Sequence, residues 1–323
     1  VGGGPSEGMM MTIALLSAAL FSSAAAVSCP PGSVPWPADV SADASSDVCE
    51  PLDSASKDAL AYLKANIFPF DAANMATYFE DGIAGASVQL ALVARQTFGW
   101  AARVPKAIWS DAVLPYAVVN EARNDWRPLL WAKLLPTLST LSNSSSLADV
   151  FKLVNAKLWG LLGSYSNTSA IVFRSEQTPL IYDPMSTMLY GYASCTGISL
   201  LLVDALRTAG VPARLVGTPA WQGNMSHGNH NWVEVYVGGT TDSGDAWAFI
   251  EGAPAGGGES LDNPCDKWFC NPGHFNFSGT EVFATRYDRG GDGAFYPMAW
   301  DMANHGVVGE DRSALYEAAC NKC

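Results

Sequence analysis

Charged side chains are scarce in this chain, and positively charged ones are the scarcest. Only 15% of the 323 residues are charged, and 18 Lys and Arg stand against 31 Asp and Glu, for a formal net charge of −13. Proteins that bind nucleic acid or anionic membrane surfaces do so mainly through Lys and Arg, so we expect no nucleic-acid partner. Hydrophobic residues make up 49% of the chain, which is enough to bury a large core in one or two domains.

Long apolar runs are also missing, apart from one near the N-terminus. Residues 13–21 read Ile-Ala-Leu-Leu-Ser-Ala-Ala-Leu-Phe, and small residues ending in Ala-Ala-Ala follow. A run of this length with an Ala-x-Ala end is typical of a secretory signal peptide, which we place at residues 9–26. An uncleaved anchor is the alternative, because no Lys or Arg precedes the run. We expect a secreted or extracellular protein, or one in an endomembrane lumen, with no stable membrane span after cleavage. Candidate glycosylation sequons then lie at Asn143, Asn167, Asn224 and Asn276.

Cysteine is infrequent, with seven in the whole chain. An even set of cysteines in a secreted protein is typical of disulfides, and we expect the local pairs Cys29–Cys49 and Cys265–Cys270 first. The sequence itself leaves the connectivity open. Cys195 is the odd cysteine, in the middle of the chain, and an unpaired thiol in an oxidising compartment indicates a reactive role.

The residues with the clearest chemistry lie between positions 190 and 251. Apolar residues recur at helical spacing just after Cys195, namely Ile198, Leu201, Leu202, Ala205 and Leu206. This pattern predicts a helix that Cys195 opens and Gly210 ends, and the start of a helix favours a thiolate. Residues 212–217, 229–237 and 247–251 are then typical of strands, with His230 near the start of the second and Glu251 at the end of the third. A thiol, an imidazole and a carboxylate in this arrangement predict a Cys-His-acid site.

Each of these residues has an ordinary structural interpretation when taken singly. A lone Cys at a helix start is usually a small buried apolar residue, and a lone His on a strand is usually a core or surface residue. Their order, and the helix and strands that bring them together, favour the Cys195–His230 pair as catalytic.

The same stretch resembles the transglutaminase-like superfamily, whose core is a papain-like fold. Members show a Cys that opens a helix, a Leu-Arg-x-x-Gly-[Ile/Val]-Pro-Ala-Arg segment, a His-x-Trp-Val-Glu-Val strand and a Trp-x-x-x-Asp strand. Here residues 206–214 read Leu-Arg-Thr-Ala-Gly-Val-Pro-Ala-Arg, and residues 230–235 read His-Asn-Trp-Val-Glu-Val. The Asp position holds Glu251, which is one methylene longer, so Asp262 and Asp245 are alternative partners for His230.

A segment upstream of the cysteine resembles one found in some secreted, bacterial-type members of this superfamily. Residues 113–116 read Val-Leu-Pro-Tyr, and Asn-Glu at 120–121 and Asp-Trp-Arg at 125–127 follow. We interpret Glu121, Asp125 and Arg127 as a solvated or salt-bridged helix face, with a place along the substrate cleft as the alternative.

These observations together predict an α+β fold. The resemblance implies a papain-like or transglutaminase-like core, in which the Cys-bearing helix packs on an antiparallel sheet. Helical patterns at residues 54–65, 87–98 and 146–162 add a mostly helical N-terminal region. We expect this region to span residues 27–165, and the core domain with a C-terminal extension to span residues 166–323.

The resemblance implies a thiol-dependent acyl transferase or amide hydrolase that acts on protein or peptide amides. Cys195 would be the nucleophile, His230 the base and Glu251 the acid that orients the imidazole. The backbone N–H of Cys195 is one expected oxyanion donor, and Tyr192 and Gln177 are candidates for the second. Transfer to an amine, peptide hydrolysis by a cysteine peptidase and N-glycan removal by a peptide N-glycanase-like amidase need the same parts, and the sequence does not separate them.

No cofactor or metal is expected. His227 and His230 are spaced for a zinc site but lack a close third ligand, and residues 288–293 lack the ligand spacing of a calcium loop. The alternative from another functional class is a non-catalytic secreted binding protein that has kept the fold.

Overall fold

The computed structural model describes residues 29–36, 48–79, 82–177, 179–239, 246–256, 270, 278–291 and 294–321. The expected signal peptide at residues 9–26 lies outside this range. So do the sequon at Asn276, the cysteine at Cys265 and the alternative acids Asp245 and Asp262.

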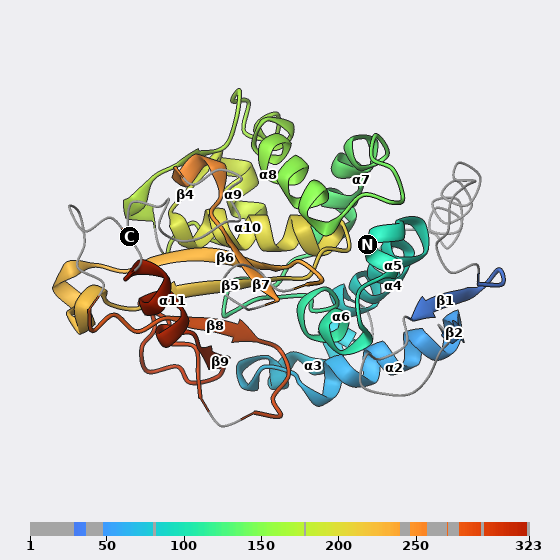
Figure 1. Ribbon diagram of the computed structural model, residues 1–323, viewed down its shortest axis with the longest axis horizontal. Coiled ribbons are helices and arrows are strands. Elements are labelled where there is room, and N and C mark those ends of the chain that lie inside the picture. Colours follow the sequence, from blue (N-terminus) through green and yellow to red (C-terminus); the bar gives the residue numbers. More distant parts are fainter. Residues whose placement is uncertain are drawn as a thin grey trace, which may run out of the picture.

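The first part of the chain is mostly helical (Figure 1). A hairpin of β1 (Ser33–Trp36) and β2 (Val48–Pro51) comes first, and helices follow: α2 (Leu52–Ala65), α3 (Met75–Phe79), α4 (Ile83–Thr97), α5 (Gly99–Ala102), α6 (Lys106–Ala112), α7 (Trp126–Leu138) and α8 (Leu147–Gly163). The helices predicted at residues 54–65, 87–98 and 146–162 correspond to α2, α4 and α8. Ser146 and Asp149 form a capping box that satisfies the first N–H groups of α8 and so defines its start.

The second part is built on a five-stranded sheet in the order β7-β6-β5-β8-β9, with every neighbouring pair antiparallel. The strands are β5 (Ala213–Thr218), β6 (His230–Tyr236), β7 (Trp247–Ile250), β8 (Phe283–Arg286) and β9 (Val308–Asp311). A short parallel pair, β3 (Val172–Phe173) and β4 (Tyr192–Ala193), precedes it. The α+β fold with a helical N-terminal region and an antiparallel sheet is therefore confirmed.

Both faces of the central strands are covered. Leu215 and Val233 belong to the large hydrophobic cluster that contains helix α10 (Cys195–Thr208). Val216 and Trp232, which are next to Leu215 and Val233 in their strands, belong to a smaller cluster that includes Tyr316 of α11 (Ser313–Cys320). Successive strand residues face opposite sides of a sheet, so β5 is buried throughout and β6 is buried up to the half-buried Tyr236.

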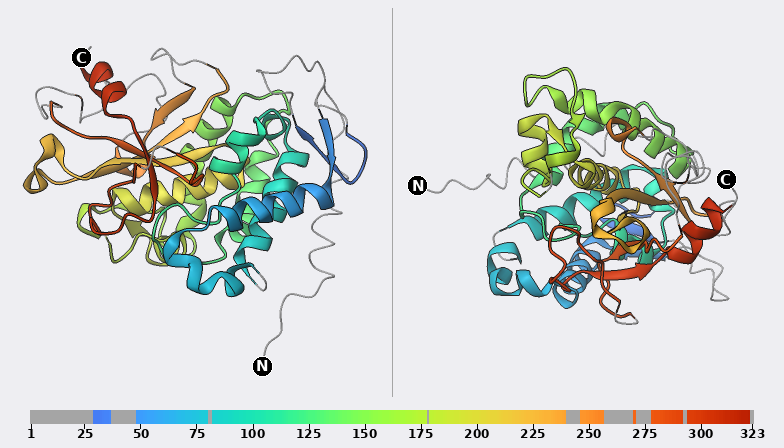
Figure 2. Two further views of the ribbon diagram at one scale, coloured as in Figure 1. Left: turned by 90° about the horizontal axis from the view of Figure 1, so that it is seen from below. Right: turned by 90° about the vertical axis from the view of Figure 1, so that its left-hand side faces the viewer.

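Helix α10 is buried along its whole length. It lies along the sheet against β5 and β6, with α7, α8 and α9 (Pro184–Tyr190) packed around it (Figures 1 and 2). Every residue of α10 is buried, whereas its sequence pattern predicts one apolar face. The pattern is incomplete because Asp204 and Arg207, polar residues on the other sides of the helix, are buried as well. Gly210 ends the helix with a φ of +75°, as predicted.

Buried arginines join the helical region to α10. The guanidinium of Arg127 donates to the carbonyl of Arg207 at 3.1 Å and to that of Val113 at 2.7 Å. Glu121 is also buried and accepts the N–H groups of residues 118 and 119. The expected solvated face is therefore wrong for Glu121 and Arg127, because both side chains bind backbone groups inside the fold. The salt-bridged part of that interpretation holds for Glu121, whose carboxylate lies 3.4 Å from Nη1 of Arg123. Asp125 is exposed, as that interpretation requires.

Asp204 is a buried acid in the middle of α10. Both of its carboxylate oxygens are buried without a hydrogen-bond partner. Burial, followed by the negative charge of Glu121, raises the pKa of Asp204 well above its ordinary value, although Arg207 and Arg127 act in the opposite direction. Burial therefore favours the protonated form of this carboxyl group.

One described disulfide lies in the N-terminal part of the chain and one in the C-terminal part. Cys29 pairs with Cys49, as predicted. The predicted local pair of Cys265 with Cys270 is wrong, because Cys270 pairs with Cys320 across a sequence separation of 50. Packing of α11 on the sheet brings these two cysteines together, and spacing along the chain carries no information about that contact. No helix among the described residues is long and apolar enough to cross a membrane.

Candidate active site

The start of α10 places Cys195 beside the sheet. Gly191 adopts a φ of +75° and turns the chain out of α9 into β4, after which Cys195 is the first residue of α10. A Cβ at Gly197 would lie 3.0 Å from the carbonyl oxygen of Ile181 and 3.0 Å from the Cα of Tyr182, so this glycine allows residues 181–182 to cross the first turn of the helix. Cys195 is a free cysteine and is only 8% exposed.

Strand pairing brings His230 and Glu251 together. β6 and β7 are antiparallel, so the start of β6 lies next to the end of β7. His230 is the first residue of β6, Glu251 directly follows β7, and His230 Nε2 lies 2.5 Å from Glu251 Oε1. The extra methylene of Glu251 therefore still allows contact with the imidazole. The backbone carbonyl of Glu251 accepts a hydrogen bond from the side chain of Asn155 in α8 at 3.0 Å. The sequence pattern did not reveal this contact.

The thiol and the imidazole are hydrogen-bonded to one another and stabilise each other's charged form. Burial acts to raise the pKa of the Cys195 thiol, yet the hydrogen bond and positive charge of His230 bring this pKa below its ordinary value. Burial acts to lower the pKa of His230, but hydrogen bonds and negative charge from Cys195 and Glu251 raise it to about 10. Because Nε2 faces Glu251, Nδ1 is the ring nitrogen left for the sulfur atom. The arrangement favours a thiolate–imidazolium pair.

Two indole rings flank the imidazole. The ring centroid of Trp221 lies 6.4 Å from that of His230 with an interplanar angle of 25°, and the centroid of Trp232 lies 5.8 Å away. Both tryptophans are buried. They exclude water from the sides of the ring, which strengthens the electrostatic interaction of His230 with its partners.

Residues 162–251 match the model of the transglutaminase-like superfamily. The match includes Cys195 and His230 and ends at Glu251, so it covers the whole candidate site. Members of this superfamily are generally cysteine enzymes, and the mixed fold described above is consistent with a transglutaminase-like core. Searches of the curated proteins and of the solved structures found no match.

Two motif residues in the matched segment form a buried ion pair. Arg214, from the Pro-Ala-Arg segment, lies opposite Glu234 of β6, and its Nη2 lies 2.7 Å from the Glu234 carboxylate. The C-terminal segment completes the cluster, because Arg312 and the hydroxyl of Tyr316 also bind Glu234, at 3.2 and 2.9 Å. The motif residues Arg214 and Glu234 thus hold the central strands together and attach α11 to them.

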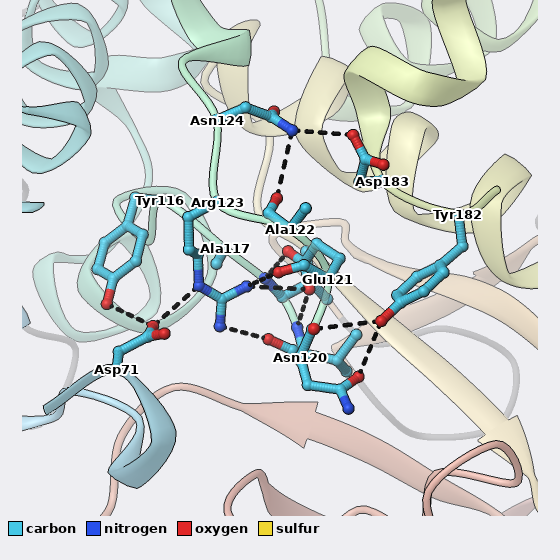
Figure 3. A network of polar contacts seen from close by, with 12 residues as sticks. Asp71, Tyr116, Ala117, Asn120, Glu121, Ala122, Arg123, Asn124, Tyr182 and Asp183 are labelled. Carbon is cyan, nitrogen blue, oxygen red and sulfur yellow. Dashed lines mark hydrogen bonds and ion pairs between the residues drawn. The ribbon is translucent and has the colours of Figure 1, made fainter. Parts of the chain in front are cut away.

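The upstream segment contacts the chain just before the cysteine (Figure 3). The Tyr182 hydroxyl donates to the carbonyl of Asn120 at 3.1 Å, and Asn124 donates to Asp183 at 2.9 Å. Asp183 also caps the start of α9 through the N–H of Ser186 at 3.0 Å. These contacts fix residues 182–183, which cross the first turn of α10.

The two predicted oxyanion candidates, Tyr192 and Gln177, precede Cys195 in the sequence. Tyr192 is half-buried in β4, and the guanidinium carbon of Arg174 lies 4.3 Å from the centroid of its ring. Gln177 ends a 3₁₀ turn, Ser175–Gln177. An oxyanion role for either side chain stays a prediction. His227 lies in an exposed turn, where its Nε2 lies 3.2 Å from Asn224 Nδ2.

Proposed function

We propose that this chain is a thiol-dependent acyl transferase or amide hydrolase of transglutaminase-like type. It acts on protein or peptide amides through Cys195, His230 and Glu251. The observation that carries the proposal is the buried contact of a free thiol, an imidazole and a carboxylate, supplied by α10, β6 and the residue after β7.

The proposed reaction begins with the Cys195 thiolate. Its sulfur attacks the carbonyl carbon of an amide, and the negative charge moves to the carbonyl oxygen. The backbone N–H of Cys195, at the start of α10, donates to that oxygen. The His230 imidazolium then gives its proton to the leaving amine, and an acyl-enzyme remains. Water or a second amine then attacks the acyl carbon as it loses a proton to His230. The thioester bond breaks, and the acyl group leaves the regenerated Cys195 thiolate. Glu251 holds the imidazole in its working orientation throughout.

The proposed location is outside the cytosol. The disulfides Cys29–Cys49 and Cys270–Cys320 are typical of proteins in an oxidising compartment. The expected signal peptide would direct the chain to such a compartment. We propose that the mature protein is secreted, as a member of the secreted, bacterial-type subgroup. Asn224 is exposed in the loop between Trp221 and His230, so a glycan there would restrict bulky substrates.

The pH dependence of Cys195 alkylation tests the proposal. Iodoacetamide labelling, followed by peptide mass spectrometry, reports the thiolate fraction in the wild type and in His230→Ala. We expect rapid labelling well below the free-thiol pKa of about 8.5, lost in His230→Ala and kept in the exposed control His227→Ala. Labelling that follows an ordinary thiol in the wild type would instead support a non-catalytic binding protein.

A second experiment separates transfer from hydrolysis. A glutamine-containing peptide is incubated with the protein in the presence and absence of a labelled primary amine. Incorporation of the amine indicates an acyl transferase, whereas release of ammonia without incorporation indicates a hydrolase. A glycopeptide and an unmodified peptide in the same assay distinguish an N-glycanase-like amidase from a cysteine peptidase.

A further inference from the structure

Asn231, which follows His230 in β6, binds the first two turns of α10 with several of its polar groups. Its side-chain Nδ2 donates to the hydroxyl of Thr196 at 2.8 Å, and its carbonyl accepts from the hydroxyl of Ser199 at 3.1 Å. Its backbone N–H donates to the sulfur of Cys195. The residue is 4% exposed, so these bonds form away from water.

The other end of the Asn231 side chain binds a tyrosine from the C-terminal half of the chain. The hydroxyl of Tyr296 donates to Asn231 Oδ1 at 2.6 Å, and Tyr296 is buried. Burial, followed by the negative charge of Cys195, raises the pKa of Tyr296, so its hydroxyl keeps the proton that it donates.

A glycine in the middle of the sheet leaves room for this contact. Gly217 of β5 pairs directly with Asn231, and a Cβ there would lie 2.6 Å from the hydroxyl oxygen of Tyr296 and still closer to Asn231 Oδ1. Glycine weakens a strand interior, and it is found where another group approaches the backbone closely. Here the approaching group is the Tyr296–Asn231 hydrogen bond.

The chemistry of the groups sets the direction of these bonds. An amide oxygen only accepts hydrogen bonds and an amide nitrogen only donates them. The Asn231 oxygen therefore accepts from the Tyr296 hydroxyl, and the Asn231 nitrogen donates to the Thr196 hydroxyl oxygen. The Thr196 oxygen is thereby occupied as an acceptor, which leaves its O–H to donate. A hydrogen bond joins this hydroxyl to the sulfur of Cys195, and a thiolate only accepts.

We propose that Tyr296, Asn231 and Thr196 form a one-way hydrogen-bond chain that holds the Cys195 sulfur as a thiolate and fixes its direction toward the imidazole. The inference rests on the proposed function, because it concerns the same sulfur atom. None of the three need touch the substrate, so they are positioning residues. They act on the thiolate from the side of the sheet, separately from His230.

The test removes single hydroxyl groups in the full chain and measures the pH dependence of Cys195 alkylation. Thr196→Val keeps the shape of the side chain and removes the donor, and we expect alkylation at pH 6 to slow about tenfold. Thr196→Ser retains the hydroxyl and should stay within about twofold of the wild type. Tyr296→Phe keeps the ring and removes a bond one step further away, so a slowing of about threefold is expected.

Matched controls come from residues of the same type elsewhere. Thr208 lies at the other end of α10, where its hydroxyl donates to the carbonyl of Asp204 at 2.7 Å. Tyr316 is a buried tyrosine on the opposite face of the sheet. Thr208→Val and Tyr316→Phe remove comparable buried hydroxyls, and neither should shift the alkylation profile.

The outcomes separate the two proposals. The alkylation profile of the wild type can depend on His230 and yet be the same in folded Thr196→Val. That result overturns the hydrogen-bond chain and leaves the proposed function standing. If Thr196→Val does not fold, Tyr296→Phe decides, and a profile identical to the wild type overturns the chain. An ordinary thiol in the wild type overturns both proposals. A shift with Thr196→Val that Thr196→Ser reverses supports the chain.

Discussion

Glu251→Gln is the substitution that examines the candidate site most directly. It keeps the length and shape of the side chain and an oxygen that can accept from His230 Nε2, but it removes the negative charge. Glu251 is fully buried, so no solvent replaces that charge. The change therefore separates the electrostatic effect of the carboxylate from its packing.

The size of the effect follows from the imidazole. The rise of the His230 pKa from 6.5 to about 10 corresponds to about 5 kcal/mol. Burial opposes this rise, and Cys195 and Glu251 drive it together through hydrogen bonds and charge. Replacing Glu251 removes one of the two groups that raise this pKa, so we expect the His230 pKa to fall by roughly one to two pH units. The thiolate–imidazolium pair then becomes about 10 to 100 times less populated relative to the neutral pair.

Alkylation of Cys195 between pH 4 and 10 measures that population. We expect the Glu251→Gln profile to move to higher pH, with kcat/KM on an amide substrate reduced by a similar factor. Glu251→Asp keeps the charge but is shorter by one methylene, so an intermediate result is expected. Glu310→Gln is the matched control, because Glu310 is paired with Arg214 at 2.7 Å and with Arg312 at 3.2 Å, in the ion-pair cluster.

One result would refute this reasoning. If folded Glu251→Gln and the wild type gave superimposed alkylation profiles, the carboxylate would not be supporting the imidazolium. The acid that orients His230 would then have to be sought elsewhere, and Asp245 and Asp262 would be the next residues to replace.

Three further predictions concern pH and stability. Activity should rise with pH as Cys195 loses its proton, below the ordinary thiol value of about 8.5, and fall again as the His230 imidazolium loses its proton near pH 10; initial rates across this range check the bell shape. The pKa of Asp204 is raised in the folded protein, so its contribution to stability is fully present below a pH of about 3.8 and is lost as the pH rises above that value. Asp204→Asn cannot ionise, so its free energy of unfolding relative to the wild type should increase by up to about 1.4 kcal/mol per pH unit over that rise. Urea unfolding at several pH values measures this difference. Replacing Cys270 and Cys320 by Ala opens a loop with a sequence separation of 50 and should lower the free energy of unfolding by about 4 kcal/mol, whereas added reductant should bring wild type and variant to the same midpoint.

Much of the local structure could be predicted because it depends on near neighbours. Helical spacing and the capping residue Ser146 define α8, and Gly210 ends α10, since both signals act within about one turn. Alternating residues with β-branched side chains predicted β6. The order of Cys195, His230 and Glu251 along these elements was enough to nominate the candidate site.

The contacts between distant parts of the chain could not be predicted in this way. Cys270 pairs with Cys320 only because α11 packs on the sheet, and Arg127 is buried only because its guanidinium reaches the carbonyl of Arg207. Tyr296 belongs to no motif near Cys195, and it reaches Asn231 through the gap that Gly217 leaves.

The sequence by itself determined which segments are helices and strands in the central stretch and which residue types they carry toward a Cys-His-acid site. The tertiary structure alone decided that Glu251 reaches His230, that α10 is buried on every side, and that Asn231 joins Tyr296 to Thr196 beside the sulfur of Cys195. The physical reason is that periodicity records the preferences of residues within a turn or a strand. The environment of a buried group depends on how separate elements pack against one another.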